Sequence, residues 1–278
     1  MRFGFHVSIA GGVQHAVARA LERQCETIQI FSRNPRGWNY RPLDTDDVAQ
    51  FRHGILKHNI QPVFVHMPYL ANLASTEDPL FRRSLDSLVE DLKRTAQLGA
   101  SYLILHVGSA PEPDKGLKQM SKGINRAFRT VGTRNNVTLL LENTAGSGRE
   151  LGHEFGQLRT IIDQVEERDR IGIVLDTAHA CAAGYDLRTA SAVDRCVTEF
   201  DRVIGLDRLA LIHLNDSKHD CGSRRDRHWH IGQGTIGTGM RHILRHAALQ
   251  DRPFIMETPR TNLKEDLMNM QEVRRLLA

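Results

Sequence analysis

The chain has 278 residues, of which 40% are hydrophobic and 25% are charged, and its formal net charge is +4. This composition is typical of a folded globular protein and excludes wholesale disorder. No apolar run approaches the roughly 18 residues that a membrane-spanning helix needs, and the first residues, MRFGFHVSIAGG, do not resemble a secretory leader, so we expect a cytoplasmic protein without a membrane partner.

Apolar runs and helical segments alternate along the chain. The apolar runs, which are typical of strands buried on both faces, are residues 2–7, 27–32, 62–67, 102–107, 137–143, 172–179, 209–215 and 253–258. The segments with helical periodicity are residues 13–23, 45–58, 80–98, 116–131, 155–167, 188–204, 240–248 and 263–277. This alternation predicts a single α/β domain over residues 1–278, a (β/α)8 TIM barrel. A doubly wound open sheet is the alternative, although no GxGxxG motif follows the first strand.

The later predicted strands each end in an imidazole or a carboxylate. These residues are His66, His106, Glu142, Asp176, His213 and Glu257. Barrel enzymes build their active sites from side chains at the C-terminal ends of different strands. A single polar residue at a strand end is often structural, but six successive residues of metal-ligand type favour a metal site at this rim.

Two short motifs add further candidate ligands. His179 follows Asp176 by three residues, and Asp226 and His228 lie in the basic loop GSRRDRHWHIGQG, where His230 could compete as a ligand. One ion takes four to six ligands, so nine candidates predict two or three ions. Nitrogen and oxygen donors without thiolate suit zinc, manganese or iron, and a cluster of such ions suits phosphodiester cleavage.

The loops predicted at the same rim are residues 33–44, 69–79, 144–154 and 217–237. They carry the segment RNPRGW, the pair Tyr69-Leu70, and Arg224, Arg225 and Arg227. Taken alone, such residues are typical of an ordinary surface. Around a metal site, however, arginines can bind phosphates while aromatic and apolar side chains can stack on or wedge between bases.

Four segments in this order resemble the endonuclease IV family of abasic-site DNA repair enzymes (AP endonuclease family 2). They are LENTAG (141–146), LDTAHACAAGYD (175–186), HLNDSK (213–218) and GSRRDRHWHIGQG (222–234). The resemblance runs from HVSIAGG to METP and so covers nearly the whole chain. It implies a zinc-dependent TIM-barrel hydrolase, a deoxyribonuclease IV, that cleaves 5′ to abasic sites in double-stranded DNA. The products are a 3′-hydroxyl and a 5′-deoxyribose phosphate, and the family also removes 3′ blocking groups.

The resemblance also implies roles for particular residues. It gives His66, His106 and Glu142 to a first zinc; Glu142, Asp176, His213 and Glu257 to a second; and His179, Asp226 and His228 to a third. Mn²⁺ or Fe²⁺ could occupy some of these sites. Glu142 is then the metal-bridging residue, and metal-bound hydroxide is the expected nucleophile. The residues implied in DNA binding are Asn34, Arg36, Tyr69 and Leu70.

The chain departs from the family pattern at Cys181, where an aromatic residue is usual, at Met67-Pro68 and at Trp229-His230. A metal-dependent sugar isomerase or epimerase of related barrel fold is the alternative enzyme, but it would leave His179, Asp226 and His228 without a role. A catalytically silent DNA-binding module is a third possibility, and it needs no ligand set. We expect the chain to act as a monomer on DNA with abasic sites or blocked 3′ ends.

Overall fold

Parallel strands form a closed barrel at the centre of the computed structural model, which describes residues 1–259 and 262–278. The barrel strands are β1 (Arg2–His6), β2 (Thr27–Phe31), β3 (Val63–His66), β4 (Tyr102–His106), β5 (Thr138–Glu142), β6 (Ile171–Asp176), β7 (Leu209–His213) and β10 (Pro253–Met256). Each strand pairs in parallel with its neighbour in the chain, and β10 closes the ring by pairing with both β1 and β7. The predicted TIM barrel is confirmed.

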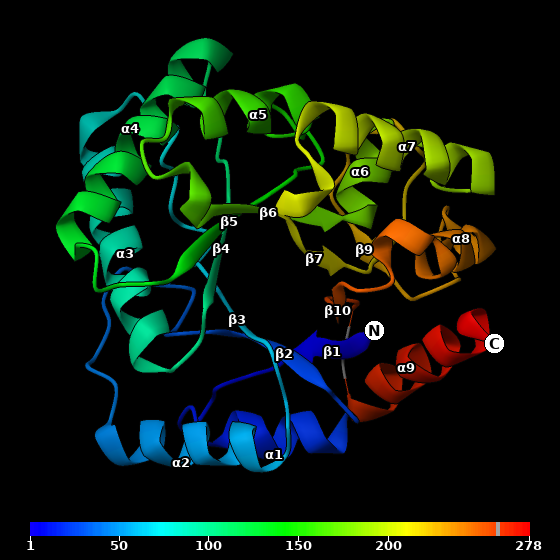
Figure 1. The fold of residues 1–278 in the computed structure, drawn as a ribbon, viewed down its shortest axis with the longest axis horizontal. Helices are drawn as coiled ribbons and strands as arrows, with labels where there is room; N and C mark the ends of the chain where they lie inside the picture. Colours follow the sequence, from blue (N-terminus) through cyan, green and yellow to red (C-terminus); the bar gives the residue numbers. More distant parts are fainter. Residues whose placement is uncertain (260–261) are drawn as a thin grey trace.

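Helices surround the barrel, as Figure 1 shows. They are α1 (His15–Glu22), α2 (Thr45–Lys57), α3 (Asp78–Gln97), α4 (Pro113–Val131), α5 (Phe155–Gln164), α6 (Thr177–Ala183), α7 (Ala190–Val203), α8 (Met240–Arg245) and α9 (Leu263–Leu277). Short 3-10 turns occupy Arg168–Arg170, Leu206–Arg208, Gly237–Gly239 and Ala247–Leu249. Among the described residues, no helix has both the length and the apolar character needed to cross a membrane.

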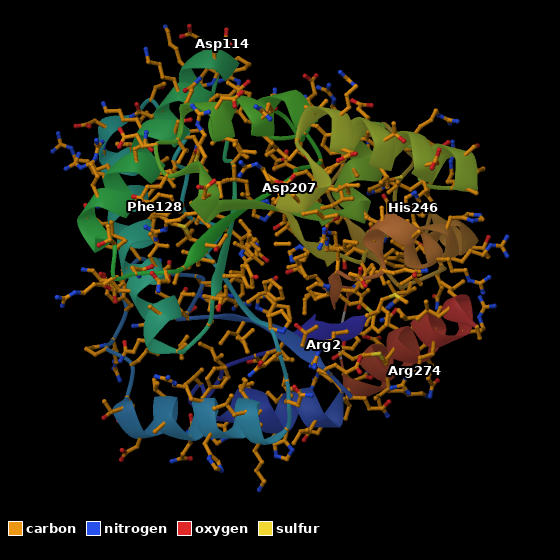
Figure 2. All side chains as sticks on the ribbon, in the orientation of Figure 1. Arg2, Asp114, Phe128, Asp207, His246 and Arg274 are labelled. Atoms are coloured by element: carbon orange, nitrogen blue, oxygen red, sulfur yellow. The ribbon has the colours of Figure 1, made fainter. Side chains whose placement is uncertain are left out.

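Two layers of apolar side chains hold the strands in place. Inside the barrel, the buried cluster consists of Phe64, Ile104, Leu140, Val174, Leu211 and Ile255, one residue from each of six strands. A larger cluster fills the space between the strands and the helices, and Figure 2 shows Phe128 of α4 within it, whereas Asp114 lies at the outer surface. Because both faces of each strand are covered, the strands form near-continuous apolar runs in the sequence.

Strand β1 depends on a residue without a side chain. A Cβ atom at Gly4 would lie 1.7 Å from the backbone oxygen of Thr27 in β2. Only glycine therefore allows β1 and β2 to approach this closely.

The largest difference from the sequence prediction lies at residues 172–179. The strand ends at Asp176, and the rest of the predicted strand belongs to helix α6. The Asp176 side chain accepts a hydrogen bond of 2.8 Å from the His179 backbone nitrogen and so caps this helix. The apolar sequence alone did not distinguish a buried strand from a short buried helix.

Other boundaries shift by a few residues. The predicted helix at 240–248 ends at Arg245, and the one at 155–167 ends at Gln164. Helices α3 and α4 begin earlier than predicted, at Asp78 and Pro113, and each carries a proline in its first turn. The loop at 217–237 contains an antiparallel pair that was not predicted, formed by β8 (Asp216–Ser217) and β9 (His228–Trp229).

Candidate metal centre

The C-terminal ends of six barrel strands bring imidazoles and carboxylates together at one rim. Five of the predicted residues are the last residues of their strands, and Glu257 follows β10 directly: His66, His106, Glu142, Asp176, His213 and Glu257. Because the strands are parallel, these side chains converge from neighbouring positions. His106 is aligned with Glu142, and Asp176 with His213.

Glu142 lies at the centre of this cluster and is fully buried. Its Oε2 lies 3.2 Å from His66 Nε2 and 3.7 Å from His106 Nε2. Its Oε1 lies 2.9 Å from His213 Nδ1 and 3.4 Å from His179 Nδ1. The two oxygens of one carboxylate therefore face two different groups of imidazole nitrogens.

Asp176 occupies a similar position on the other side of the cluster. Its Oδ1 caps helix α6, while its Oδ2 accepts a hydrogen bond of 2.7 Å from Asn215 Nδ2. The same Oδ2 lies 3.8 Å from His213 Nδ1 and 3.5 Å from His228 Nε2. Asp176 thus lies between His213 and His228, whereas the family resemblance implied it only for the group of His213.

Helix α6 and the β8–β9 hairpin add the remaining candidate ligands. His179 Nε2 lies 3.3 Å from Asp226 Oδ1 and 3.2 Å from His228 Nε2. His230, by contrast, contacts Asn269 Nδ2 at 3.1 Å and belongs to none of the ligand groups described below. The idea that His230 could compete as a ligand is therefore not supported by its position.

A buried carboxylate holds the loop that carries Asp226 and His228. Asp216 is fully buried, and its oxygens accept hydrogen bonds of 2.8 to 3.0 Å from four backbone N–H groups, those of Ser217, Gly234, Ile236 and Gly237. A Cβ atom at Gly234 would lie 2.3 Å from the Ser217 backbone oxygen, so the loop requires glycine there. This anchoring fixes the hairpin beside α6.

Backbone carbonyls orient three of the candidate ligand histidines. The Nδ1 atoms of His66, His179 and His228 lie 2.7, 2.9 and 3.1 Å from the carbonyl oxygens of Met67, Asn143 and Glu257. A carbonyl oxygen only accepts, so each Nδ1 carries the proton and each Nε2 is available as a ligand atom. Such partners on the second ring nitrogen are typical of metal-binding histidines.

The charges at the site are strongly coupled. Burial would raise the pKa of Glu142, but His213 and His106 hold it well below its usual range. Burial would lower the pKa of His213, but the carboxylates of Glu142 and Glu257 raise it to about 9. Burial lowers the pKa of His106 to about 4, so this imidazole is neutral at pH 7. Glu142 thus stays ionised, and its buried negative charge attracts cations.

Three groups of side chains bring their ligand atoms within 4.8 Å of one another. They are His66, His106 and Glu142; Asp176, His179 and His228; and Glu142, Asp176, His213 and Glu257. Eight of the nine predicted ligands belong to these groups, and the ninth, Asp226, lies beside the second group through His179. Imidazole and carboxylate donors at this density fit first-row divalent metals.

A cavity of about 240 Å³ opens beside these groups. Its lining includes His106, His179 and Asp226 together with Tyr69 and Glu150. Tyr69 is 63% exposed, and its ring centroid lies 5.5 Å from that of His66. Burial raises the pKa of Glu150, an effect that the nearby Asp226 carboxylate strengthens. Leu70, the neighbour of Tyr69, is 40% exposed, so two large side chains are exposed to solvent beside the cavity.

The loop after β2 borders a wider groove of about 900 Å³ that contains Asn34 and Arg36. Both residues are exposed, and Asn34 Oδ1 accepts a hydrogen bond of 3.0 Å from the Arg36 backbone nitrogen. Beneath them, the buried Arg33 contacts both oxygens of the buried Asp91 in α3, at 3.2 and 3.1 Å. The exposed loop is therefore anchored to the helical layer by a buried ion pair.

Sequence reasoning missed the side chains that support the candidate ligands. Asn143 and Asn215 follow strand-end positions, and each contacts Asp176. Gln29 is a fully buried amide in the middle of β2. The signal available in the sequence was a single polar residue inside the apolar run TIQIF, a position that a strand buried on both faces does not favour.

Comparisons with known proteins agree with this geometry. Residues 17–277 match the family described as "Xylose isomerase-like TIM barrel". The chain is 46% identical to a protein of Methanoculleus marisnigri and 43% identical to one of Cenarchaeum symbiosum, both named "Probable endonuclease 4". These alignments cover 98% and 99% of this chain, respectively, and the same shares of the two relatives.

Two solved structures resemble this chain over its whole length. Endonuclease IV from Thermus thermophilus superposes with a TM-score of 0.90 at 38% identity, covering 100% of this chain and 99% of that one. A D-tagatose 3-epimerase-like protein superposes with a TM-score of 0.75 at 17% identity, covering 100% of this chain and 97% of that one. At that identity the similarity shows a shared fold alone.

Proposed function

The chain belongs to the endonuclease IV family and is accordingly a metal-dependent AP endonuclease, and from this premise we propose that it works with three zinc ions. The proposed reaction hydrolyses the phosphodiester 5′ to an abasic site and leaves a 3′-hydroxyl and a 5′-deoxyribose phosphate. The same centre would remove blocking groups from 3′ ends. Mn²⁺ or Fe²⁺ could replace zinc at some positions, because the donors are nitrogen and oxygen.

The position of Glu142 is the observation that carries this proposal. One oxygen faces His66 Nε2 and His106 Nε2, and the other faces His213 Nδ1. A buried carboxylate with a separate set of nitrogen donors on each oxygen is suited to bridge two ions. A sugar isomerase with one or two ions would not need the additional group at His179 and His228.

The ligand groups supply the proposed assignment. His66, His106 and Glu142 would hold the first ion; Glu142, Asp176, His213 and Glu257 the second; and His179, Asp226 and His228 the third, with Asp176 beside it. When bound, the ions would activate water as the nucleophile and neutralise charge on the phosphate and the leaving oxygen. The side chains would hold these positions rigidly, because seven of the nine ligands lie at strand ends, in α6 or in β9, and Glu257 follows β10 directly.

The rim residues would bind the DNA. Arg36 and Asn34 border the groove of about 900 Å³ and would contact the phosphate backbone. Tyr69 and Leu70, both exposed, would enter the duplex at the lesion. An abasic nucleotide has no base to unstack, so its extrusion toward the cavity costs little, which would favour this lesion over an intact nucleotide.

The test is incision of an end-labelled duplex that carries one abasic-site analogue, with the zinc content measured on the same preparation. We expect cleavage on the 5′ side, a 3′ end that a polymerase extends, and about three zinc ions per chain. A second duplex with a 3′-phosphate tests the removal of blocking groups. A zinc-loaded protein that leaves the DNA intact but interconverts a free sugar would refute the proposal in favour of an isomerase.

We also propose that residues 1–278 form one domain that acts as a monomer. The proposed ligands derive from strands along most of the chain, from β3 to β10, so the site would not need a second copy. Light scattering during size-exclusion chromatography should give the mass of one chain, 31.4 kDa.

A further inference from the structure

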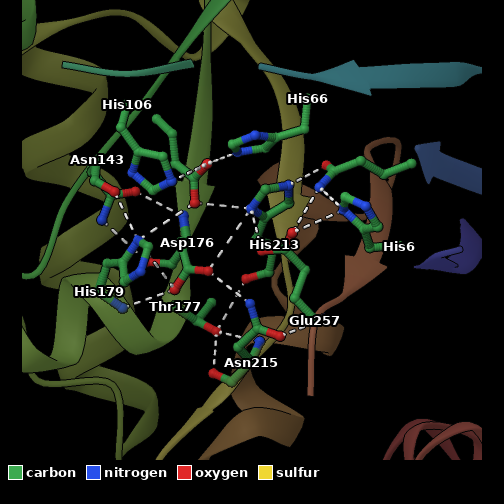
Figure 3. A network of polar contacts seen from close by, with 12 residues as sticks. His6, His66, His106, Asn143, Asp176, Thr177, His179, His213, Asn215 and Glu257 are labelled. Carbon is green, nitrogen blue, oxygen red and sulfur yellow. Dashed lines mark hydrogen bonds and ion pairs between the residues drawn. The ribbon is translucent and has the colours of Figure 1, made fainter. Parts of the chain in front are cut away.

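A buried amide lies between two of the proposed ligands and makes three polar contacts. Gln29 Oε1 lies 2.7 Å from His213 Nε2, and Gln29 Nε2 lies 2.6 Å from Glu257 Oε1. The same Nε2 lies 2.9 Å from His6 Nδ1. His6, His213 and Glu257 converge on this point, on one side of the cluster in Figure 3.

The chemistry of the partners fixes the orientation of this amide. An ionised carboxylate only accepts hydrogen bonds, so the amide atom facing Glu257 must be the NH2 group. The atom facing His213 is then the carbonyl oxygen, and His213 Nε2 must carry the proton that it receives. His213 Nδ1 is thereby left to point toward Glu142 Oε1 at 2.9 Å and Glu257 Oε2 at 3.3 Å.

The two oxygens of the Glu257 carboxylate contact different partners. Its Oε1 accepts from Gln29, while its Oε2 faces His213 Nδ1. One amide therefore turns both a ligand nitrogen and a ligand oxygen toward the same point. That point belongs to the group of Glu142, Asp176, His213 and Glu257.

We propose that Gln29 is a positioning residue for the metal ion held by Glu142, Asp176, His213 and Glu257, and that it selects the His213 tautomer and the Glu257 orientation which that ion requires. The inference rests on the proposed three-ion function and specifies how one of its sites is built. His66, His179 and His228 are oriented by backbone carbonyls, which a substitution does not remove. His213 depends on a side chain, so its orientation can be changed by mutation.

Two substitutions of Gln29 separate its contact with His213 from its contact with Glu257. Gln29→Met has a similar length and removes all three polar contacts, including the one with His6. Gln29→Glu keeps an oxygen for His213 Nε2 but places a second carboxylate against Glu257, in place of the donor at 2.6 Å. The matched control is Thr27→Val. Thr27 is a buried residue of the same strand as Gln29, and this change removes its hydrogen bond of 2.5 Å to the Pro62 carbonyl.

Zinc binding is measured by competition with a chelator, and the histidine side chains are observed by long-range ¹H–¹⁵N correlation spectra of the zinc-loaded protein. Removal of the partner of a ligand histidine weakens metal binding by about 10- to 100-fold. We therefore expect Gln29→Met to lower the affinity for one of the three zinc ions by this factor and to leave the affinity for the other two unchanged. The spectrum should lose one protonated-Nε2 signal, that of His213. Gln29→Glu should keep that signal but still bind the ion more weakly, and Thr27→Val should match the wild type.

Kinetics give a second readout. The polar partners of the Gln29 side chain, His6, His213 and Glu257, do not belong to the proposed DNA-binding loops. Gln29→Met should therefore lower kcat for incision and leave KM for the abasic duplex unchanged. Wild-type zinc affinity in Gln29→Met would overturn the inference while leaving the proposed function intact, and so would an equal loss at all three ions. A wild-type chain that binds no zinc would instead refute the proposed function, and this inference with it.

Discussion

Replacement of Glu142 by glutamine tests the centre of the proposed site. The change adds no volume, but a glutamine presents one oxygen where the glutamate presents two. Whichever way the amide turns, an NH2 group faces either His66, now 3.2 Å from the carboxylate, or His213, now 2.9 Å from it. One of the two groups thus loses its oxygen ligand, and the centre loses one negative charge.

The expected loss of activity follows from this geometry. An ion in such a centre contributes several kcal/mol to stabilising the charge that develops in the transition state. A loss of about 4 kcal/mol corresponds to roughly a thousandfold slower cleavage. Single-turnover incision of an abasic duplex measures the rate, metal analysis gives the ions retained, and thermal melting checks the fold. Glu166→Gln, which alters only a surface ion pair with Arg129, is the control.

A result in which Glu142→Gln incises DNA at the wild-type rate with its full metal content would refute the bridging role. A result in which the variant unfolds would be visible in the melting curve. In that case Glu142→Asp, which keeps two oxygens on a shorter side chain, would provide the comparison, and it should retain more activity than the glutamine variant.

Further predictions concern pH, DNA binding and the loop anchor. Metal-free protein should lose up to about 3 kcal/mol of stability as the pH rises from 6.5 to about 9, because the raised pKa of His213 stabilises the fold only while the imidazole is protonated. The zinc-loaded protein should gain stability over the same range, since zinc binds the deprotonated ring; urea melts with chelator or with zinc would contradict this if both slopes had the same sign. Tyr69→Ala should weaken binding to an abasic duplex by about 1–3 kcal/mol. Arg36→Ala should reduce the salt dependence of the DNA-binding constant by about one released ion. Neither change should remove zinc, and a fall in metal content would show that these residues support the metal centre instead. Asp91→Ala should destabilise the fold by about 3–5 kcal/mol in denaturant titrations, because it leaves the buried Arg33 without its carboxylate; a change below about 1 kcal/mol would mean that the ion pair does not anchor the loop.

The barrel and the main candidate cluster could be predicted because both follow from local rules. Apolar runs such as LILHV and TLLLEN specify strands, and in parallel strands the residues at the ends, such as His106 and Glu142, meet at one rim. The spacing of the strands along the chain then gives the closed barrel without any knowledge of contacts between distant residues.

Other features depend on contacts that local patterns do not reveal. Gln29 and His213 are separated by 184 residues, and their hydrogen bond exists only once the barrel has closed. Nothing in the local pattern distinguishes Asp216 from the other polar residues of HLNDSK, yet its carboxylate holds a loop about 20 residues farther along the chain. The predicted strand ran past the true end of β6 because Asp176 is followed by more small and apolar residues. Only the structure shows that Asp176 caps a helix there.

The position of β10 determines when the barrel can close during synthesis of the chain. This strand pairs with both β1 and β7, and Glu257 follows it near the end of the chain. During synthesis on the ribosome, the first seven strands emerge before the segment that completes the ring. Nascent or prematurely terminated chains therefore lack one proposed ligand and the closing strand together. We therefore expect such fragments neither to close the barrel nor to complete the group of Glu142, Asp176, His213 and Glu257.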